Sequence, residues 1–371
     1  MSFNKIKLMA IMWDSHEPIL ERASKHVDMD ITYYSSKDLS SDDDCLDKLI
    51  SEMNDSDIIL LYRSSTDFWD KLEDRINLIK NNKKIVCFGS DPTHWSLTSV
   101  DHEIAITAFQ YASNSGEENF IRLFNFLGNK LCGMQVEVLP PVELPWQGII
   151  HPDCPGTVFS RTTDYMQWYG KDRTQPWVGI IASRPVWAMD GCAVECNLLR
   201  DLENLGINVI LIFTTFSKDI SKGALSVSEA AEKYFMLDNI PLVNAVVKFT
   251  TAFVGGNTYG DDAQASIGGE EILSLLDVPV YQPVVLSRMS VEEWRNSLGL
   301  TSDITWQIVF PEFEGIIEPL VIGSDKGYST IDSDLRIVLE ERSRKIAQRV
   351  AKQINLQRKS NSEKKGFNLF K

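Results

Sequence analysis

Short apolar runs alternate with helical patterns through the first third of the chain. Helices are predicted by the spacing of apolar residues over Pro18–Val27, Asp43–Met53, Phe68–Ile79 and Glu117–Leu127. Four runs have the length and residue types of buried strands: Ile6–Trp13, Ile31–Tyr34, Ile58–Tyr62 and Ile85–Phe88. This alternation indicates parallel strands with crossover helices, so we predict an N-terminal α/β domain over residues 1–131.

A connector rich in proline and aromatic residues interrupts the alternation over residues 132–175. Its aromatic side chains predict a packed segment, and Tyr165–Tyr169 has the pattern of a short helix with an aromatic face. The prolines are Pro140, Pro141, Pro145, Pro152 and Pro155.

A second alternating unit follows over residues 176–332. Its predicted strands are Trp177–Ala182, Val209–Phe213, Ala245–Phe249, Val278–Val285, Ile304–Val309 and Ile316–Ile322. Its predicted helices are Cys192–Leu205, Ser228–Met236, Glu270–Leu276 and Val291–Leu298. The predicted fold class is α/β, with two doubly wound parallel-sheet units, Rossmann- or flavodoxin-like, joined by the connector and followed by a C-terminal helix.

The C-terminal helix is predicted over residues 333–357, with an apolar stripe on one side and basic residues on the other, and a disordered basic tail follows over 358–371. The net charge of the chain is −15, but Leu335–Lys371 holds eleven Lys/Arg against three Glu, which gives +8 and leaves −23 for the rest. This acidic body argues against nucleic acid as the main partner. We interpret the helix as a docking face for a partner or a domain.

Bulk features predict a cytoplasmic protein. No apolar run approaches the roughly 20 residues of a membrane-spanning helix. The N-terminus runs into a strand pattern without a small-residue cleavage site. Six cysteines are spread thinly through the chain, which favours free thiols over a disulfide framework.

The turn RPVWAMDG (Arg184–Gly191), with Asp190 among its candidate substrate-binding residues, is the first candidate ligand site. It follows a predicted strand at the end where open α/β sheets bind ligands. Arg184 could meet a carboxylate and Trp187 could stack on a ring. Gly191 could let backbone amides face an anion at the start of the next helix. The alternative is an ordinary loop in which Asp190 is the N-cap of that helix.

Other residues with suitable chemistry carry weaker signals. In PEFEGIIEP, Glu312 and Glu314 would share a face of an extended segment and could contact a cation or an N–H group of a ligand; the alternatives are a solvated loop or carboxylates that hold an arginine. Cys192 and Cys196 have a spacing that could hold a metal or could simply bury two thiols. Three histidines are candidate metal ligands or, alternatively, packed or capping residues: His16, His94 and His151.

An ordered series of motifs covers nearly the whole chain. They are Ser113–Leu127 (SNSGEENFIRLFNFL), His151–Tyr169, Pro176–Leu199, Ala245–Gly256, Val278–Gln282, Pro311–Gly323 and Leu356–Lys365. In this order they resemble the N-terminal portion of the large, tetrapyrrole-handling subunits of cobaltochelatases (CobN type) and magnesium chelatases (H type). The resemblance implies either part of such a large subunit or a short paralogue. In one departure, Val186 stands beside Trp187 where many relatives carry a histidine.

The resemblance also implies a function and partners. The chain would bind a corrinoid or porphyrin precursor, with Co²⁺ or Mg²⁺ as the substrate metal, and would dock AAA+ ATPase subunits that use ATP and Mg²⁺. The chain itself has no G-x-x-x-x-G-K-[ST] motif, and we expect no cofactor bound to it and no metal insertion by it alone. The alternative is a non-catalytic sensor of a small ligand or a scaffold that docks a protein.

Overall fold

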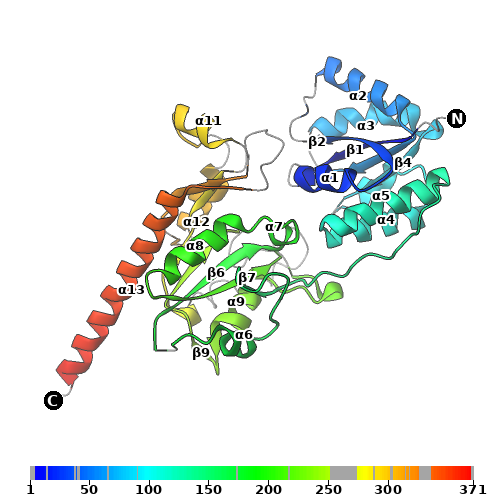
Figure 1. Cartoon of the computed structure of the whole chain (residues 1–371). Helices are drawn as coiled ribbons and strands as arrows, with labels where there is room; N and C mark the ends of the chain where they lie inside the picture. The colour runs from blue at the N-terminus through cyan, green and yellow to red at the C-terminus, as the bar shows by residue number, and fades with distance from the viewer. Residues whose placement is uncertain are drawn as a thin grey trace. The chain divides into compact units, whose positions relative to one another are not determined.

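The computed structural model describes residues 5–13, 16–36, 39, 42–64, 67–89, 91–172, 174–215, 218–250, 274–286, 289–300, 304–313, 315–316, 318–325 and 336–368 (Figure 1). The chain divides into two compact units, Met1–Leu144 and Pro145–Lys371. The boundary between them lies inside the segment that the sequence predicts as a connector.

Four parallel strands form the sheet of the N-terminal unit, in the order β2-β1-β3-β4. They are β1 (Ile6–Met12), β2 (Met29–Ser35), β3 (Ile58–Tyr62) and β4 (Lys84–Phe88). All four predicted strands are confirmed. Three of them, β1, β3 and β4, are buried along nearly their whole length and therefore read as continuous apolar runs.

Five α-helices accompany this sheet in the described part of the unit: α1 (Glu17–Ser24), α2 (Asp43–Asp55), α3 (Asp67–Ile79), α4 (His102–Asn114) and α5 (Glu117–Cys132). Apolar residues of α2 and α3 pack with Met9 and Ile11 of β1 in one buried cluster. α4 was not predicted from the sequence. Its N-cap is Asp101, whose carboxylate accepts from the Glu103 amide, and only small or aromatic residues bury its inner face.

Asn119 in the first turn of α5 anchors the segment that follows this helix within the same unit. Asn119 is 1% exposed, and its carboxamide binds both backbone groups of Val142, at 3.0 and 2.8 Å. Tyr111 also donates to the Leu139 carbonyl at 2.6 Å. These bonds hold residues 139–142 against α4 and α5, so the connector belongs in part to the N-terminal unit.

A five-stranded sheet forms the centre of the C-terminal unit, in the order β11-β10-β6-β7-β5. Its strands are β5 (Gly148–Ile150), β6 (Trp177–Ser183), β7 (Asn208–Thr214), β10 (Ala245–Lys248) and β11 (Val280–Tyr281). Only β5 runs antiparallel to its neighbour. The predicted α/β fold with parallel sheets is therefore confirmed.

Helices cover both faces of this sheet. On one face, α8 (Ala193–Glu203) and α13 (Glu340–Asn368) pack against alternate residues of β6, β7 and β10. On the other face, α6 (Thr162–Tyr169) and α9 (Val227–Phe235) pack against the intervening residues of the same strands. The predicted short aromatic helix is thus confirmed as α6. A small hairpin, β8 (Met236–Leu237) and β9 (Ile240–Pro241), follows α9.

The single strand predicted over Val278–Val285 is wrong, because the chain leaves one sheet and enters another within it. After β11, Gln282 and Pro283 lead into β12 (Val284–Leu286), which pairs with β13 (Val321–Ser324). β13 also pairs with β14 (Ile337–Val338) in a separate three-stranded sheet. Pro283 has no N–H to donate to the first ladder, which suits a strand break at this position.

Two further predictions near this sheet need correction. The strand predicted over Ile304–Val309 is helical: Thr305–Val309 forms π-helical turns that continue into α12 (Phe310–Phe313). The strand predicted over Ile316–Ile322 is displaced toward its end and becomes β13. The short helix α11 (Val291–Asn296) is confirmed, with a capping box between Ser290 and Glu293.

The long C-terminal helix α13 runs over Glu340–Asn368, beginning later than predicted and continuing past residue 357. Ile346, Val350 and Ile354 lie on one stripe, are at most 1% exposed and complete the core on the α8 face. None of the helices in the described ranges is both long enough and apolar enough to cross a bilayer.

A buried ion cluster joins α8 to the three-stranded sheet. Arg336 Nη1 lies 2.5 and 2.7 Å from the two carboxylate oxygens of Glu195, and Arg336 Nε lies 2.6 Å from Asp325. The Glu195 side chain is 1% exposed and that of Arg336 10% exposed. Although burial opposes the charge, the two carboxylates raise the pKa of Arg336 above its usual value.

A second cluster packs the connector around His151. Its imidazole lies against Tyr165, Trp168 and Tyr169, and His151 Nε2 is 3.5 Å from the Glu203 carboxylate. Burial lowers the pKa of His151, with Glu203 opposing that effect. The connector is therefore packed by its aromatic residues, as the sequence analysis predicts.

The first prediction concerns the ion cluster. Glu195→Ala should lower the free energy of unfolding of the C-terminal unit by about 3 kcal/mol or more, because it leaves a buried guanidinium with one carboxylate. Urea unfolding followed by circular dichroism measures this. Glu340→Ala removes the exposed carboxylate beside Arg344 and should cost under about 1 kcal/mol. Equal losses in the two variants would contradict the prediction.

The second prediction concerns His151. Its pKa is lower in the folded than in the unfolded chain, so protonation favours the unfolded state once the pH falls below the unfolded pKa of about 6.5. Wild type should therefore lose more stability between pH 8 and pH 5.5 than His151→Asn, which keeps an acceptor for the Asp153 amide. Thermal melts at both pH values compare the two proteins. Identical pH dependence would show that His151 does not contribute.

Candidate functional site

The candidate loop after β6 lies at the carboxyl end of the central strand of the five-stranded sheet. Strand β6 has β10 on one side and β7 on the other. The chain passes from β6 through α7 (Arg184–Ala188) and α8 to β7, and from β7 through α9 on the opposite face to β10. In an open α/β sheet, ligands usually bind at the carboxyl ends of two adjacent strands where the connecting helices change from one face of the sheet to the other.

Arg184 is held inside its own unit. It is 2% exposed, its Nε donates to the Pro145 carbonyl at 2.9 Å, and its guanidinium lies 3.8 Å from the centre of the Trp146 ring. Burial lowers the pKa of Arg184 to about 10. A ligand carboxylate could reach this group only by replacing contacts that the fold already supplies.

Trp187 stacks on Phe213 of β7. The two rings are nearly parallel, at 6°, with centroids 3.7 Å apart. Trp187 is half-buried, so the stack covers part of the indole and leaves part of it accessible. Another planar ring could extend this stack.

Asp190 and Gly191 end the loop without forming the predicted N-cap or anion site. Asp190 is exposed and has φ +59°, and Cys192 occupies the N-cap position of α8. The Gly191 amide donates to the Val186 carbonyl at 2.8 Å, so it is used within the loop. A Cβ at Gly191 would lie 3.0 Å from that same carbonyl, so a larger residue would require the loop to shift by a few tenths of an ångström.

Three buried polar residues lie at the carboxyl ends of β10 and β11. They were not predicted from the sequence. Lys248 is 1%, Thr250 6% and Gln282 3% exposed. Thr250 Oγ1 and Gln282 Oε1 are buried without a hydrogen-bond partner in the described part of the chain. Val247 of β10 pairs with Tyr281 of the adjacent strand β11, and Lys248 and Gln282 are the next residues of the chain after this pair.

These three residues are chemically suited to a polar ligand group. Lys and Thr side chains can donate to a carboxylate or carbonyl oxygen, and a Gln carboxamide can accept or donate. Buried polar atoms without partners are uncommon, because each costs about 1–3 kcal/mol of desolvation. A lysine at the end of an apolar strand (AVVK) was the available sequence signal.

Glu312 does not lie in the predicted extended segment. Glu312 is exposed on α12, which is helical, and Glu314 lies outside the described residues. Glu318 forms an ion pair with Arg349 of α13. The structure therefore favours the alternative in which a carboxylate of this motif holds an arginine.

The three histidines are packed among aromatic and backbone groups. His16 is stacked on Tyr62 and contacts Phe120. His94 is 4% exposed in the 3-10 helix Pro92–Leu97. Within the described ranges, no group of three or more His, Cys, Asp or Glu residues could hold a metal ion.

The cysteine pair on α8 fits the buried-thiol alternative. Burial raises the pKa of Cys192 well above its usual value and that of Cys196 to about 11. Cys192 belongs to the apolar core on the α8 face of the sheet, and Cys196 packs against it.

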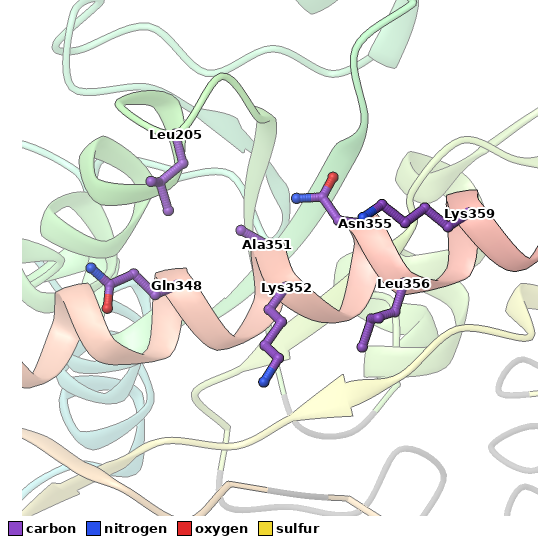
Figure 2. Close-up of a pocket in the computed structure, with 7 residues that line it drawn as sticks. All are labelled: Leu205, Gln348, Ala351, Lys352, Asn355, Leu356 and Lys359. Carbon is purple, nitrogen blue, oxygen red and sulfur yellow. The ribbon is translucent and has the colours of Figure 1, made fainter.

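A groove lies along α13, away from the loop after β6 in the same unit. It has a volume of about 350 Å³ and is lined by Leu205, Gln348, Ala351, Lys352, Asn355, Leu356 and Lys359 (Figure 2). Its lining combines apolar and basic side chains and contains none of the predicted site residues.

Comparison with known proteins identifies the family. A family model described as CobN/Magnesium Chelatase matches residues 109–366. An uncharacterised protein of Methanocaldococcus jannaschii is 30% identical over 369 residues, which cover 97% of this chain and 28% of the relative. The H-type subunit of the magnesium chelatase of Chlorobaculum parvum is 25% identical over 228 residues, or 59% of this chain and 17% of the relative.

A solved structure shows the same fold. The catalytic subunit of cobaltochelatase from Mycobacterium tuberculosis matches with a TM-score of 0.56 and 18% identity, over 96% of this chain and 28% of that chain. The chain thus spans less than a third of the length of each of these relatives. Because the family model covers more than half of the chain, the chain belongs to the CobN/magnesium chelatase family.

Proposed function

We propose that this chain is the N-terminal part, or a short paralogue, of the large tetrapyrrole-binding subunit of an ATP-dependent cobalt or magnesium chelatase. The main support is the family match over residues 109–366, which reaches from α4 almost to the end of α13. The proposed partners are a corrinoid or porphyrin precursor and AAA+ ATPase subunits.

Metal insertion into a tetrapyrrole has requirements that this chain can meet only in part. The macrocycle needs a planar apolar contact, its polar arms need hydrogen-bond partners, and the pyrrole protons need a base. Trp187 on Phe213 offers the planar contact. Lys248, Thr250 and Gln282 offer partners for a polar arm at the ends of the neighbouring strands.

The remaining requirements would fall to other parts of the assembly. The sequence has no Walker-type loop, so ATP and its Mg²⁺ would be bound by the AAA+ subunits. Among the described residues, no group of three or more His, Cys, Asp or Glu side chains could hold the metal ion. We therefore propose that the chain binds substrate and partners but does not insert metal alone.

A scaffold that docks a protein is the second candidate function. The observation in its favour is that Arg184 and the Gly191 amide, both predicted to contact a ligand, are committed to contacts within the unit. In this case the loop after β6 would be structural, and the groove along α13 would carry the function.

The third prediction tests tetrapyrrole binding. Titration of the purified chain with a corrinoid precursor, protoporphyrin and sirohydrochlorin should quench tryptophan fluorescence saturably. Trp187→Ala should raise the Kd about tenfold, since it removes the stacking surface. Trp168→Phe, which changes another partly exposed tryptophan, should leave the Kd unchanged. Absence of saturable binding to all three compounds would favour the scaffold.

The fourth prediction tests the buried polar residues. Thr250→Val removes a hydroxyl that has no hydrogen-bond partner among the described residues. It should leave the stability of the free chain unchanged or raise it by up to about 1 kcal/mol, yet weaken tetrapyrrole binding severalfold. In the matched control, Thr214→Val removes a hydroxyl that donates to the Leu225 carbonyl at 3.0 Å. That variant should lose about 1 kcal/mol.

Thermal melts and the same titrations measure both effects. If Thr250→Val bound the macrocycle as wild type does, Thr250 would have no contact with it. If the variant were destabilised like Thr214→Val, its hydroxyl would have a structural partner.

A further inference from the structure

The groove along α13 is built from two elements that are far apart in the sequence. Leu205 follows the end of α8, and the other lining residues belong to α13 (Figure 2). In Figure 2 the Leu205 side chain points toward α13 from the neighbouring helix end. The groove is therefore part of one packed unit rather than a gap between the two units.

The α13 side of the groove forms one continuous stripe. Gln348, Lys352 and Lys359 are separated by four and seven residues, so they share a face of the helix. At a rise of about 1.5 Å per residue, the stripe from 348 to 359 is about 16 Å long, or roughly three helical turns. This length matches a short helix lying alongside α13.

Two exposed leucines provide the apolar contact. Leu205 is 46% and Leu356 52% exposed, whereas Ile346, Val350 and Ile354 on the other stripe of α13 are buried. Large apolar side chains that flank a groove are typical anchors for an amphipathic helix. Their exposure leaves apolar surface for a partner to cover.

The charge of the groove is positive. Lys352 and Lys359 line it, and none of its lining residues is Asp or Glu. The glutamates at the start of α13 are paired with Arg344 and Lys345, and Arg349 is paired with Glu318. Lys352 makes no ion pair within the residues that the structure describes.

From this combination we infer that the groove binds an acidic amphipathic helix of a protein partner. Leucine-like side chains of the partner pack between Leu205 and Leu356, and its flanking carboxylates lie near Lys352 and Lys359. The carboxamides of Gln348 and Asn355 can bond polar groups at the groove edge. This inference does not depend on tetrapyrrole binding, since the groove contains none of the residues proposed for that site.

The fifth prediction uses a labelled, designed peptide of about 18 residues, with leucines at helical spacing and glutamates on the flanks. Fluorescence anisotropy with the full chain should show saturable binding. Lys352→Glu and Leu356→Asp should each raise the Kd at least about tenfold, because they remove the charge and the apolar contact separately. Both side chains are exposed, so these variants should fold normally.

Two controls separate this site from general attraction to a basic helix. Lys345→Glu makes the same charge change on α13 outside the groove and should alter the Kd less than about twofold. A peptide of the same composition with its leucines scrambled should bind much more weakly.

Several results would overturn the inference. They are equal effects of Lys345→Glu and Lys352→Glu, equal binding of the scrambled peptide, or no saturable binding. Stronger Lys352-dependent binding to anionic vesicles or to a DNA duplex would assign the groove to a different class of partner. Sedimentation that showed a dimer of the free chain, lost in Leu356→Asp, would identify the occupant as a second copy.

Discussion

The C-terminal unit depends on a guanidinium that is buried between two carboxylates from different parts of the chain. Arg336 precedes β14, Glu195 lies in the first turn of α8, and Asp325 follows β13. Arg336 also donates to the Gly191 carbonyl at 3.3 Å. A buried charge is tolerated only when all its partners are in place. The cluster therefore fixes the loop after β6 to the three-stranded sheet, so the candidate site is positioned by an element that arrives more than a hundred residues later.

The parallel strands could be predicted from the sequence, because burial on both faces gives apolar runs that need no knowledge of their neighbours. For the same reason, no local pattern marks the point at which the chain leaves one sheet and enters the other. Val278–Val285 is one apolar run, yet Tyr281 pairs with β10 and Val284 with β13. Periodicity also cannot distinguish a short apolar helix from a strand, which explains the error over Ile304–Val309. In each case the assignment depended on pairing, which a local pattern does not contain.

The sequence predicts the loop after β6 as a candidate position for a site, but it does not predict how the residues there are packed. The end of a central parallel strand is a position that the order of elements supplies. The commitment of Arg184 to Trp146 and Pro145 includes a hydrogen bond that spans 39 residues, which no spacing rule predicts. The lack of partners for Thr250 and Gln282 among the described residues is likewise a property of the packed unit. The charged and aromatic candidates that the sequence predicts all lie within one loop, whereas the buried polar residues Lys248, Thr250 and Gln282 lie at the adjacent strand ends.

The docking role proposed for α13 rests on its charge as well as on its apolar residues. Ile346, Val350 and Ile354 complete the core, so the basic residues must lie on the remaining faces of the helix. The rest of the chain carries −23, so an acidic partner would be repelled from most of the surface and attracted to this helix. Long-range electrostatic attraction would favour the approach of an acidic partner to α13, but salt at ordinary concentration screens this attraction beyond about 10 Å. The leucines beside Lys352 are what can turn that attraction into a specific contact, because apolar burial requires the partner to fit the groove.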